Sequence, residues 1–404
     1  MYFALAYFIM VLILFNNYSW IIFISFIVYA FSVPTASIFE KYFASKFFTL
    51  IKDEKSFLGL LIYFITILVI LAIFSTSLLS KIFGGFSKII EFNTYFIAAS
   101  ISIAVMLTFF EAISSKVFEK FLIPVVTAIL LFMFFNTPNP ELLLDFTIGL
   151  VIAGIIAYAS YRVKFLTANG SVATFLLAGF IFGLGGWQWS VPMMTFFILS
   201  SLFSKARKKK NKKIEEFFEK TGVRDYMQVL ANGGIGGILV ILNQIFPNSI
   251  LYIIYLAVLS AVCADTWATE IGTMFKTNTY NIINFRPVEQ GISGGISLIG
   301  SLGALAGAFT IAISGILWNE LNIYYYFTIV LMGGMIGSFF DSILGATVQA
   351  QNHCNVCKKQ TEREYHCGEK SIPFRGYHWM NNDIVNLLSG ISGGLFIIII
   401  FAII

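Results

Sequence analysis

Residues 250–272 read ILYIIYLAVLSAVCADTWATEIG, an apolar run whose last part contains two carboxylates and two hydroxyls. A run of this length and composition is typical of a helix that spans a bilayer. An ionisable side chain there costs roughly 2.5 kcal/mol or more, so it is rarely present without a partner or a function. In a helix, positions i, i+4, i+7 and i+11 share one face, and here they are Asp265, Thr269, Gly272 and Lys276. This face would combine the groups that bind a metal-bound phosphate.

The whole chain has the composition of a membrane protein. Of its 404 residues, 58% are hydrophobic and 12% are charged, whereas about a quarter of the residues in a soluble domain are charged. We therefore predict an all-α, polytopic integral membrane protein with about thirteen transmembrane helices. The candidate spans are 3–15, 20–34, 57–79, 94–110, 121–136, 143–161, 172–186, 187–204, 227–246, 250–272, 293–318, 323–348 and 384–404.

The positive charges indicate an orientation. If Lys205–Lys213 (KARKKKNKK) is cytoplasmic and the spans alternate from there, all of the 26 Lys and Arg residues except Lys81 and Lys88 lie in the cytoplasm. This asymmetry follows the positive-inside rule. We expect a cytoplasmic N-terminus, cytoplasmic functional loops, and a basic face that attracts anionic membrane lipids or nucleotides. Because no aromatic residues interleave with the basic run, no nucleic-acid partner is expected.

The two parts of the chain share a weak pattern. Residues 55–64 (KSFLGLLIYF) and 291–302 (GISGGISLIGSL) both have a polar start, a glycine and an apolar continuation. Residues 111–130 similarly correspond to 341–345 together with 382–390. The N-terminal counterpart of Asp265, near residues 35–37, has no acid. The pattern favours two related modules with a degenerate first copy, as in many duplicated membrane folds; the alternative is the general similarity of any two membrane halves.

Several ordered motifs carry a resemblance to a known family. They are RDYMQVLANGG (224–234), ADTWATEIG (264–272), the stretch from Arg286-Pro287-Val288 to Gly294-Gly295-Ile296-Ser297, DSILGATVQ (341–349) and WMNNDIVN (379–386). Residues 141–404 resemble an integral membrane family that contains the chloroplast phytyl-phosphate kinase of vitamin E synthesis and the animal transmembrane protein 19. The resemblance implies phosphoryl transfer from a nucleoside triphosphate (CTP or ATP) to an isoprenyl monophosphate, giving the diphosphate.

The first part of the chain resembles a second family. KSFLGLLIYF and EAISSKVFEKFLIPVVTAIL (111–130) are similar to the CTP-dependent phytol and dolichol kinases, although the Asp-Thr motif of that family is not visible. We therefore predict a degenerate kinase-like module at 1–140. The second module, at 141–404, includes a cytoplasmic Cys/His loop at 349–380.

Three acids near helix ends, Asp265, Asp341 and Asp383, are the candidate catalytic residues. Carboxylate oxygens together with phosphate are what Mg²⁺ accepts, so Asp265 and Glu270 are candidate Mg²⁺ ligands. The two lie about 140° apart around a helix and face one ion only if the helix unwinds. Asp265 is the better candidate, and Glu270 is a candidate partner for Lys276 or Arg286. The alternatives are a structural ion pair or an interhelix hydrogen bond for Asp265, and a helix cap for Asp383.

A glycine-rich segment, Gly291–Ser297, opens a predicted helix, where backbone N–H groups can contact phosphate. It is not a Walker A loop because no Gly-Lys-Ser/Thr follows, and close helix packing is the alternative role of its glycines. The candidate phosphate- or nucleotide-binding residues are Lys276, Arg286, Ser293, Gly294, Gly295, Asn232 and Asn382.

Cysteine and histidine cluster in one loop. The spacing Cys354-x2-Cys357 followed by His366-Cys367 predicts a structural Zn²⁺ site with tetrahedral N/S ligation. Because adjacent residues strain when both bind one ion, His353 or His378 is an alternative fourth ligand. A reduced thiol pair and a redox site remain alternatives.

Two rival functions fit the same composition. A transporter or lipid flippase also has glycine-rich helices, repeats and intramembrane acids, but its acids are expected near the bilayer midplane. A non-catalytic membrane assembly factor would not depend on nucleotide. For a kinase, apolar helices would hold the prenyl chain, and the phosphate acceptor would need no catalytic base.

Overall fold

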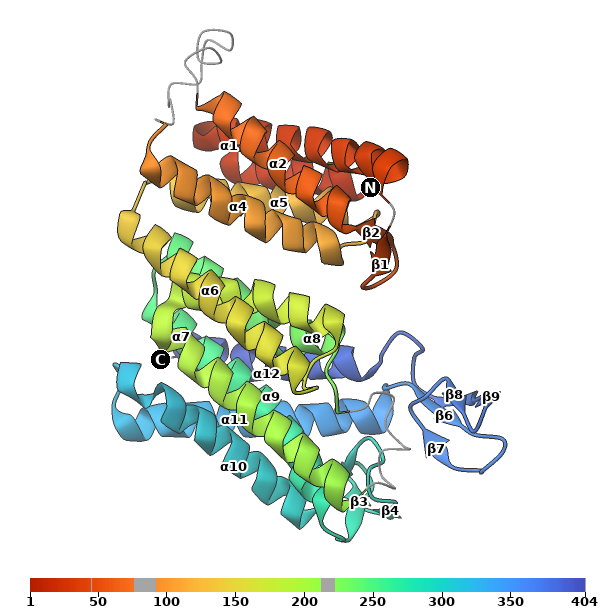
Figure 1. Cartoon of the computed structure of the whole chain (residues 1–404). Coiled ribbons are helices and arrows are strands. Elements are labelled where there is room, and N and C mark those ends of the chain that lie inside the picture. Colours follow the sequence, from red (N-terminus) through yellow and green to blue (C-terminus); the bar gives the residue numbers. More distant parts are fainter. Residues whose placement is uncertain (45, 76–91, 212–221, 404) are drawn as a thin grey trace. The chain divides into compact units, whose positions relative to one another are not determined.

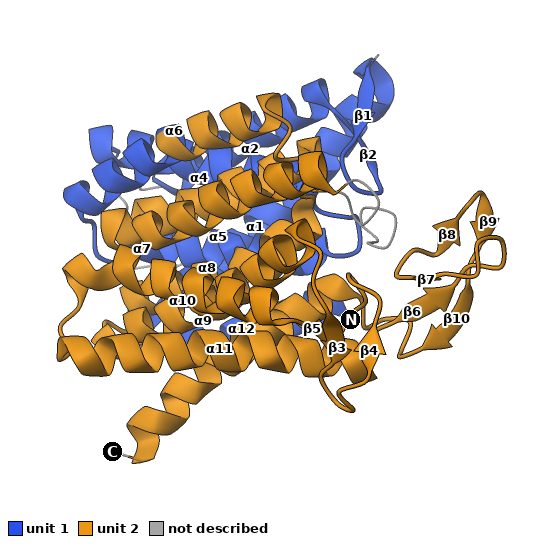
Figure 2. Cartoon of the chain, turned by 90° about the horizontal axis from the view of Figure 1, so that it is seen from below, with its two compact units in different colours: residues 1–151 blue, residues 152–404 orange. Residues whose placement is uncertain are grey.

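The computed structural model describes residues 1–44, 46–75, 92–211 and 222–403. These residues include 11 helices that are long and apolar enough to cross a membrane, so the predicted all-α, polytopic membrane class is confirmed. The chain divides into two compact units, Met1–Val151 and Ile152–Ile404 (Figures 1 and 2). This division falls within the helix that begins at residue 140, the predicted module boundary. Lys81 and Lys88, predicted to be external, lie outside the described residues.

Unit 1 is a helical bundle with one short hairpin. Its elements are α1 (Tyr2–Phe43), β1 (Phe47–Thr49), β2 (Glu54–Ser56), α2 (Phe57–Phe74), α4 (Thr94–Ile113), α5 (Glu119–Leu131), a π-helical turn (Phe132–Asn136) and the first half of α6 (Pro140–Arg162). Helix α1 folds back at Tyr18, whose backbone is non-helical. The rings of Phe3 and Phe26 are 4.9 Å apart, whereas a straight helix would separate these residues by about 35 Å. The two arms of α1 cover two of the predicted spans.

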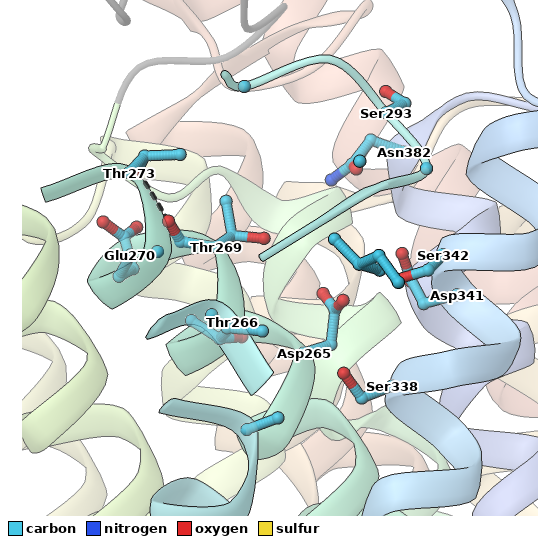
Figure 3. A pocket seen from close by; sticks show the side chains of 18 of the residues that line it. Asp265, Thr266, Thr269, Glu270, Thr273, Ser293, Ser338, Asp341, Ser342 and Asn382 are labelled. Carbon is cyan, nitrogen blue, oxygen red and sulfur yellow. Dashed lines mark hydrogen bonds between the residues drawn. The ribbon is translucent and has the colours of Figure 1, made fainter. Parts of the chain in front are cut away.

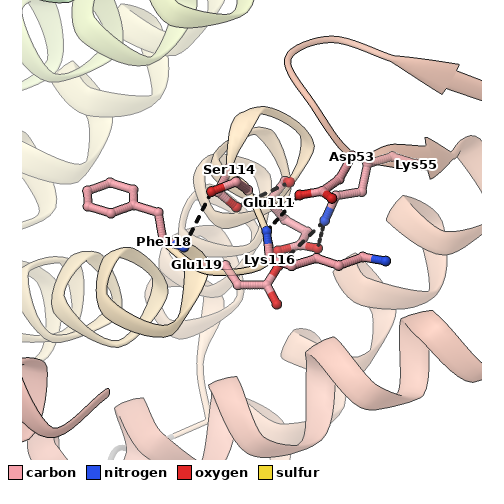
Figure 4. Close-up of polar contacts among 8 residues, drawn as sticks. Asp53, Lys55, Glu111, Ser114, Lys116, Phe118 and Glu119 are labelled. Atoms are coloured by element: carbon pink, nitrogen blue, oxygen red, sulfur yellow. Dashed lines mark hydrogen bonds and ion pairs between the residues drawn. The ribbon is translucent and has the colours of Figure 1, made fainter. Parts of the chain in front are cut away.

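A buried ion cluster joins the elements of unit 1 (Figure 4). The Lys55 amino group in β2 contacts Glu111 of α4 and lies 3.6 Å from a carboxylate oxygen of Glu119 in α5. Burial lowers the pKa of Lys55, but the Glu111 and Glu119 carboxylates raise this pKa more, so the net shift is upward. The next residue, Ser56, caps α2 by accepting a hydrogen bond from the Gly59 N–H at 3.0 Å. Unit 1 therefore has acids at its helix ends, although none lies at residues 35–37.

Unit 2 contains the second half of α6, α7 (Ala168–Lys210), α8 (Tyr226–Ile245), α9 (Ser249–Met274), α10 (Leu298–Gly315) with a 3-10 turn (Ile316–Trp318), α11 (Ile323–Thr347) and α12 (Asn382–Ile403). Helix α7 also folds back, at Gly186, where φ is +57° and a side chain would be strained. As a result Leu177 and Met193, 16 residues apart, both pack against Gly233 of α8. The arms of α7 cover two more predicted spans, and the number of membrane crossings stays a prediction.

Short strands connect the helices at one end of unit 2 (Figure 1). Between α9 and α10, β3 (Thr279–Asn281) pairs antiparallel with β4 (Pro287–Val288) and β5 (Gly295–Ile296). Between α11 and α12, β6 (Gln351–His353) lies between β7 (Gln360–Thr361) and β10 (Ile372–Arg375), and β8 (Tyr365–His366) pairs with β9 (Glu369–Lys370). These connections close the unit over the ends of α9 and α11.

Helix α9 is the centre of unit 2, and every residue from Tyr252 to Ala264 is buried. Neighbouring helices approach its backbone through glycines. A Cβ at Gly307 of α10 would lie 2.9 Å from the Cys263 carbonyl oxygen, and one at Gly393 of α12 would lie 2.9 Å from the Ala257 carbonyl oxygen. Such small-residue contacts let membrane helices gain van der Waals energy from their backbones. The helix that carries Asp265 is thus enclosed by protein.

Replacing Gly307 with alanine should destabilise unit 2, because the new methyl group would meet the backbone of α9. Overpacking of this kind costs about 1–3 kcal/mol. The matched control is Gly234→Ala, since a Cβ there has nothing within 4 Å. Thermal unfolding of the detergent-purified protein should show a lower midpoint for Gly307→Ala and an unchanged or higher one for Gly234→Ala. Equal midpoints for both variants would contradict the packing argument.

Candidate functional site

A polar cavity of about 210 Å³ lies at the strand-covered end of unit 2 (Figure 3). Its walls come from α7 to α12 and from the connections that follow α9 and α11. Eight of the sequence-predicted site residues line it: Asn232, Asp265, Glu270, Ser293, Gly294, Gly295, Asp341 and Asn382. Tertiary structure therefore brings together residues that are up to 150 positions apart in the sequence.

Asp265 of α9 and Asp341 of α11 face each other in this cavity (Figure 3), close enough for their carboxyl groups to interact. Asp265 stands nine residues before the end of α9, about 14 Å along the helix. The Asp341 Oδ2 atom is buried and accepts no hydrogen bond from the described residues. Two facing carboxylates repel each other unless a proton or a cation lies between them. Their hard oxygen atoms suit Mg²⁺.

Glu270 is engaged in a different interaction. Its carboxylate accepts hydrogen bonds from the Arg207 guanidinium at 2.5 Å and the Ser204 hydroxyl at 2.6 Å, both on α7. The Arg207 and Glu270 side chains are only 4% and 11% exposed. The expected partners, Lys276 and Arg286, are thus replaced by Arg207. Since α9 stays helical, Glu270 points to α7 whereas Asp265 points to α11 (Figure 3).

Three predicted residues do not line the cavity: Lys276, Arg286 and Asp383. Helix α9 ends at Met274 and the next residue is extended, so the helical face does not continue to Lys276. Lys276 and Arg286 are exposed, whereas Asp383 is buried in the first turn of α12. The cap suggested for Asp383 is provided by Asn381, which accepts a hydrogen bond from the Ile384 N–H at 3.1 Å.

The glycine-rich segment Gly291–Ser297 forms one wall of the cavity. Gly294 has φ +81° and packs so closely on Ala346 of α11 that a side chain would collide there. Ser297 caps α10 by accepting a hydrogen bond from the Gly300 N–H at 3.1 Å. The start of α10, including Gly300 and Ser301, also lines the cavity. A helix N-terminus of this kind favours anions, including phosphate.

Sequence reasoning missed several lining residues, above all the buried cations Arg207 and Arg224. The Arg224 guanidinium lies 5.3 Å from the ring centre of Phe196 and 5.5 Å from that of Phe197. Burial lowers the pKa of Arg224. In the sequence, Arg207 is one of several Lys and Arg residues in the run 205–213. Its contact with Glu270 distinguishes it from the others, and this contact is visible only in the structure. For Arg224, the available signal was its place at the start of an ordered family motif.

A second cavity, of about 70 Å³, adjoins the polar one. Apolar side chains of α6, α7 and α8 dominate its lining, including Ile156, Leu177, Ile181, Phe182, Met193 and Phe197. Arg224, Gln228 and Asn232 line both cavities. The Asn232 Oδ1 atom is buried and accepts no hydrogen bond from the described residues. The two adjoining cavities thus differ in lining, polar on one side and apolar on the other.

The Cys/His loop forms a separate cluster. The ligand atoms of Cys354, Cys357, His366 and Cys367 all lie within 4.8 Å of one another. The other two histidines are not part of this group, and His378 instead lies 2.9 Å from Glu364.

Sequence comparisons identify the relatives of this chain. Protein PGR of Arabidopsis thaliana is 28% identical over 275 residues, which cover 62% of this chain and 93% of that protein. An uncharacterized membrane protein of Methanocaldococcus jannaschii is 27% identical over 264 residues, covering 65% and 96% of the two chains. Protein VTE6, chloroplastic, of Arabidopsis thaliana is 23% identical over 229 residues, covering 55% of this chain and 62% of that protein. No solved structure matches.

The family comparison covers more than half of the chain. The family described as Integral membrane protein DUF92 matches residues 151–394. This region contains both facing carboxylates, the glycine-rich segment and the Cys/His cluster, and it begins where unit 2 begins. The resemblance of residues 1–140 to phytol and dolichol kinases stays a prediction. The chain belongs to the DUF92 family of integral membrane proteins.

Proposed function

We propose that unit 2 transfers a phosphoryl group from a nucleoside triphosphate, CTP or ATP, to an isoprenyl monophosphate and so forms the prenyl diphosphate. The observation that carries this proposal is the pair of adjoining cavities, polar with two facing acids on one side and apolar on the other. The family resemblance to the phytyl-phosphate kinase points to the same chemistry. The acceptor in this reaction has a charged head and a hydrocarbon tail. These two parts correspond to the polar cavity and the apolar cavity.

The acceptor would bind across the boundary between the cavities. Its tail would lie among the apolar side chains of α6, α7 and α8. Its phosphate would then reach Arg224 and Asn232, which line both cavities. The guanidinium of a buried arginine provides several donors for phosphate oxygens. Asn232 would donate through its amide nitrogen.

The triphosphate would bind in the polar cavity. Asp265 and Asp341 would hold Mg²⁺, which neutralises charge on the transferred phosphoryl group. Backbone N–H groups of Gly291–Ser297 and the start of α10 would contact the phosphates. Because an acceptor phosphate oxygen is already a nucleophile, the residues only have to position the two substrates and stabilise charge. Glu270 would fix Arg207 in the wall rather than bind the metal.

The position of the cavity also bears on the rival classes. The cavity extends from the helix ends, under loops and strands, to Asp265 about 14 Å inside α9, and α7 contributes Lys208–Lys210 at the same end. From the positive-inside rule we expect this end to be cytoplasmic, where nucleotides are available. A transporter or flippase would be expected to present its acids along a path through the bilayer.

The direct test uses purified protein with phytyl or geranylgeranyl monophosphate, Mg²⁺ and labelled CTP or ATP. We expect the prenyl diphosphate as product, and a loss of at least about 100-fold for Asp265→Asn and Asp341→Asn, since each removes a charge that acts in the transition state. Glu320→Gln is the matched control, because this exposed acid is not in the cavity lining. No diphosphate with any donor, or full activity of Asp265→Asn, would refute the kinase proposal.

The apolar cavity should determine the chain length of the acceptor. Ala178 lines this cavity, so Ala178→Phe should raise KM for a long-chain prenyl phosphate about tenfold, the penalty of roughly 1.4 kcal/mol expected from filling part of a pocket. KM for a short-chain acceptor should change little. Ala159→Phe, at an exposed position of α6, provides the control. Equal effects of Ala178→Phe on both acceptors would place the tail elsewhere.

The Arg207–Glu270 pair should act mainly on stability. Arg207→Ala leaves a buried carboxylate uncompensated, which costs about 3–5 kcal/mol. The double variant Arg207→Met/Glu270→Gln should recover most of this loss, and Lys209→Ala, at an exposed site on the same helix, should have no effect. Thermal unfolding midpoints measure these differences. If Glu270→Gln instead leaves stability unchanged but raises the Mg²⁺ requirement, Glu270 is a metal ligand.

A further inference from the structure

The Cys/His cluster has the dimensions of a tetrahedral metal site. The His366 Nδ1 atom lies 3.5 Å from the Cys357 Sγ atom and 3.2 Å from the Cys367 Sγ atom. With Zn–S near 2.3 Å and Zn–N near 2.0 Å, ligands on a tetrahedral zinc are about 3.6 Å apart for an S···N pair and about 3.8 Å for an S···S pair. The four ligand atoms, all within 4.8 Å of one another, need only small shifts to enclose one ion.

Two tight turns present these ligands. Lys358, directly after Cys357, has φ +59°, and its N–H donates to the Cys354 carbonyl oxygen at 3.0 Å. In the second turn, Cys367 and Gly368 have φ +52° and +83° and form the two-residue loop between β8 and β9. Positive φ at both positions is the geometry of a type I′ hairpin. The same turn lets the adjacent residues His366 and Cys367 both face the centre of the cluster.

The loop lacks a hydrophobic core of its own. Between β6 and α12, several large apolar side chains are exposed: Val356 at 54%, Tyr365 at 66%, Ile372 at 51% and Phe374 at 59%. A segment of this size cannot bury enough apolar surface to hold a unique structure without a disulfide or a metal. Cys354, Cys357 and Cys367 are free thiols. A metal is therefore the stabilising element that fits these residues.

The cluster lies at the tip of a hairpin whose base reaches the polar cavity. Cys354 follows β6 directly, and Glu362 follows β7, its antiparallel partner. One Glu362 carboxylate oxygen accepts hydrogen bonds from the Ser293 hydroxyl at 2.5 Å and the Gln349 amide at 3.0 Å. A one-residue slip of β7 against β6 would turn Glu362 to the opposite face. The register of this hairpin therefore decides whether Glu362 meets the glycine-rich segment.

We propose that Cys354, Cys357, His366 and Cys367 bind one structural Zn²⁺, and that this ion holds the β6–β7 hairpin in the register that keeps Glu362 against Ser293. This proposal does not rest on the proposed phosphoryl transfer. With all four positions occupied by protein ligands, the ion has no open position for a substrate.

Metal binding is tested on the full-length protein purified in detergent. We expect one equivalent of zinc, and thiolate-to-cobalt charge-transfer absorption with tetrahedral d–d bands after exchange for Co²⁺. Cys357→Ser and His366→Ala should each lose the zinc and the Co²⁺ spectrum. His353→Ala, His378→Ala and Cys263→Ser are the controls, because these residues are outside the cluster, and they should keep both.

Three results would overturn the metal site. They are a wild-type protein without zinc or Co²⁺ spectrum, a Cys357→Ser variant with a full equivalent of zinc, and loss of the metal in His378→Ala but not in His366→Ala. Size-exclusion chromatography of each variant verifies that the helical part is folded. Loss of metal in a monodisperse variant then reports on the site alone.

Hydrogen exchange tests the coupling to the cavity. Removing zinc with a chelator should increase exchange several-fold in residues 351–362 and also in 289–297, the segment that contains Ser293. Glu362→Gln should increase exchange in 289–297 while the protein keeps its zinc, because the charged acceptor of the Ser293 hydroxyl is lost. If zinc removal changes 351–362 but leaves 289–297 unchanged, the metal does not position Glu362, and this part of the proposal is wrong.

Discussion

The close approach of backbones around α9 is the constraint on which the rest of unit 2 depends. Inside a bilayer, lipid tails are as apolar as leucine, so helices gain little by burying hydrophobic side chains against each other. Glycines on α10, α11 and α12 instead bring their backbones directly onto α9. This packing encloses α9, and its polar residues therefore face neighbouring helices instead of lipid. Asp265 and Glu270 can be accommodated in the membrane part only because of this enclosure.

The neighbours of each acid then decide its role. Glu270 has a guanidinium and a hydroxyl as partners, so its charge is compensated within the protein. Asp265 faces the carboxyl group of Asp341, and two facing carboxylates repel each other unless a proton or a cation lies between them. Two acids on the same helix, five residues apart, are thus suited to different tasks. The Arg207–Glu270 pair and the facing Asp265 and Asp341 carboxylates both line the polar cavity.

The two units start one helix in the same way but differ in the residue that precedes this start. Each starts a helix with a serine that accepts the N–H of a glycine three residues later: Ser56 and Gly59 in α2, Ser297 and Gly300 in α10. In unit 1 the lysine before this serine provides the positive charge for Glu111 and Glu119. In unit 2 the residue before this serine is Ile296. The kinase-like nature of the N-terminal module stays a prediction.

The sequence by itself determined the membrane class and indicated most helices of unit 2, and it singled out the segment around Asp265, because hydrophobic length and isolated charges are local properties of the chain. It also placed Cys354, Cys357, His366 and Cys367 in one group, since they lie close together along the chain. Only the tertiary structure decided that Arg207 compensates Glu270, that Asp341 faces Asp265, and that Arg224 and Glu362 reach the cavity. The two residues of each pair lie on different elements, so whether they meet depends on how the helices pack against each other. The hydrophobic periodicity of a single helix shows which face is buried but does not identify the neighbouring helix.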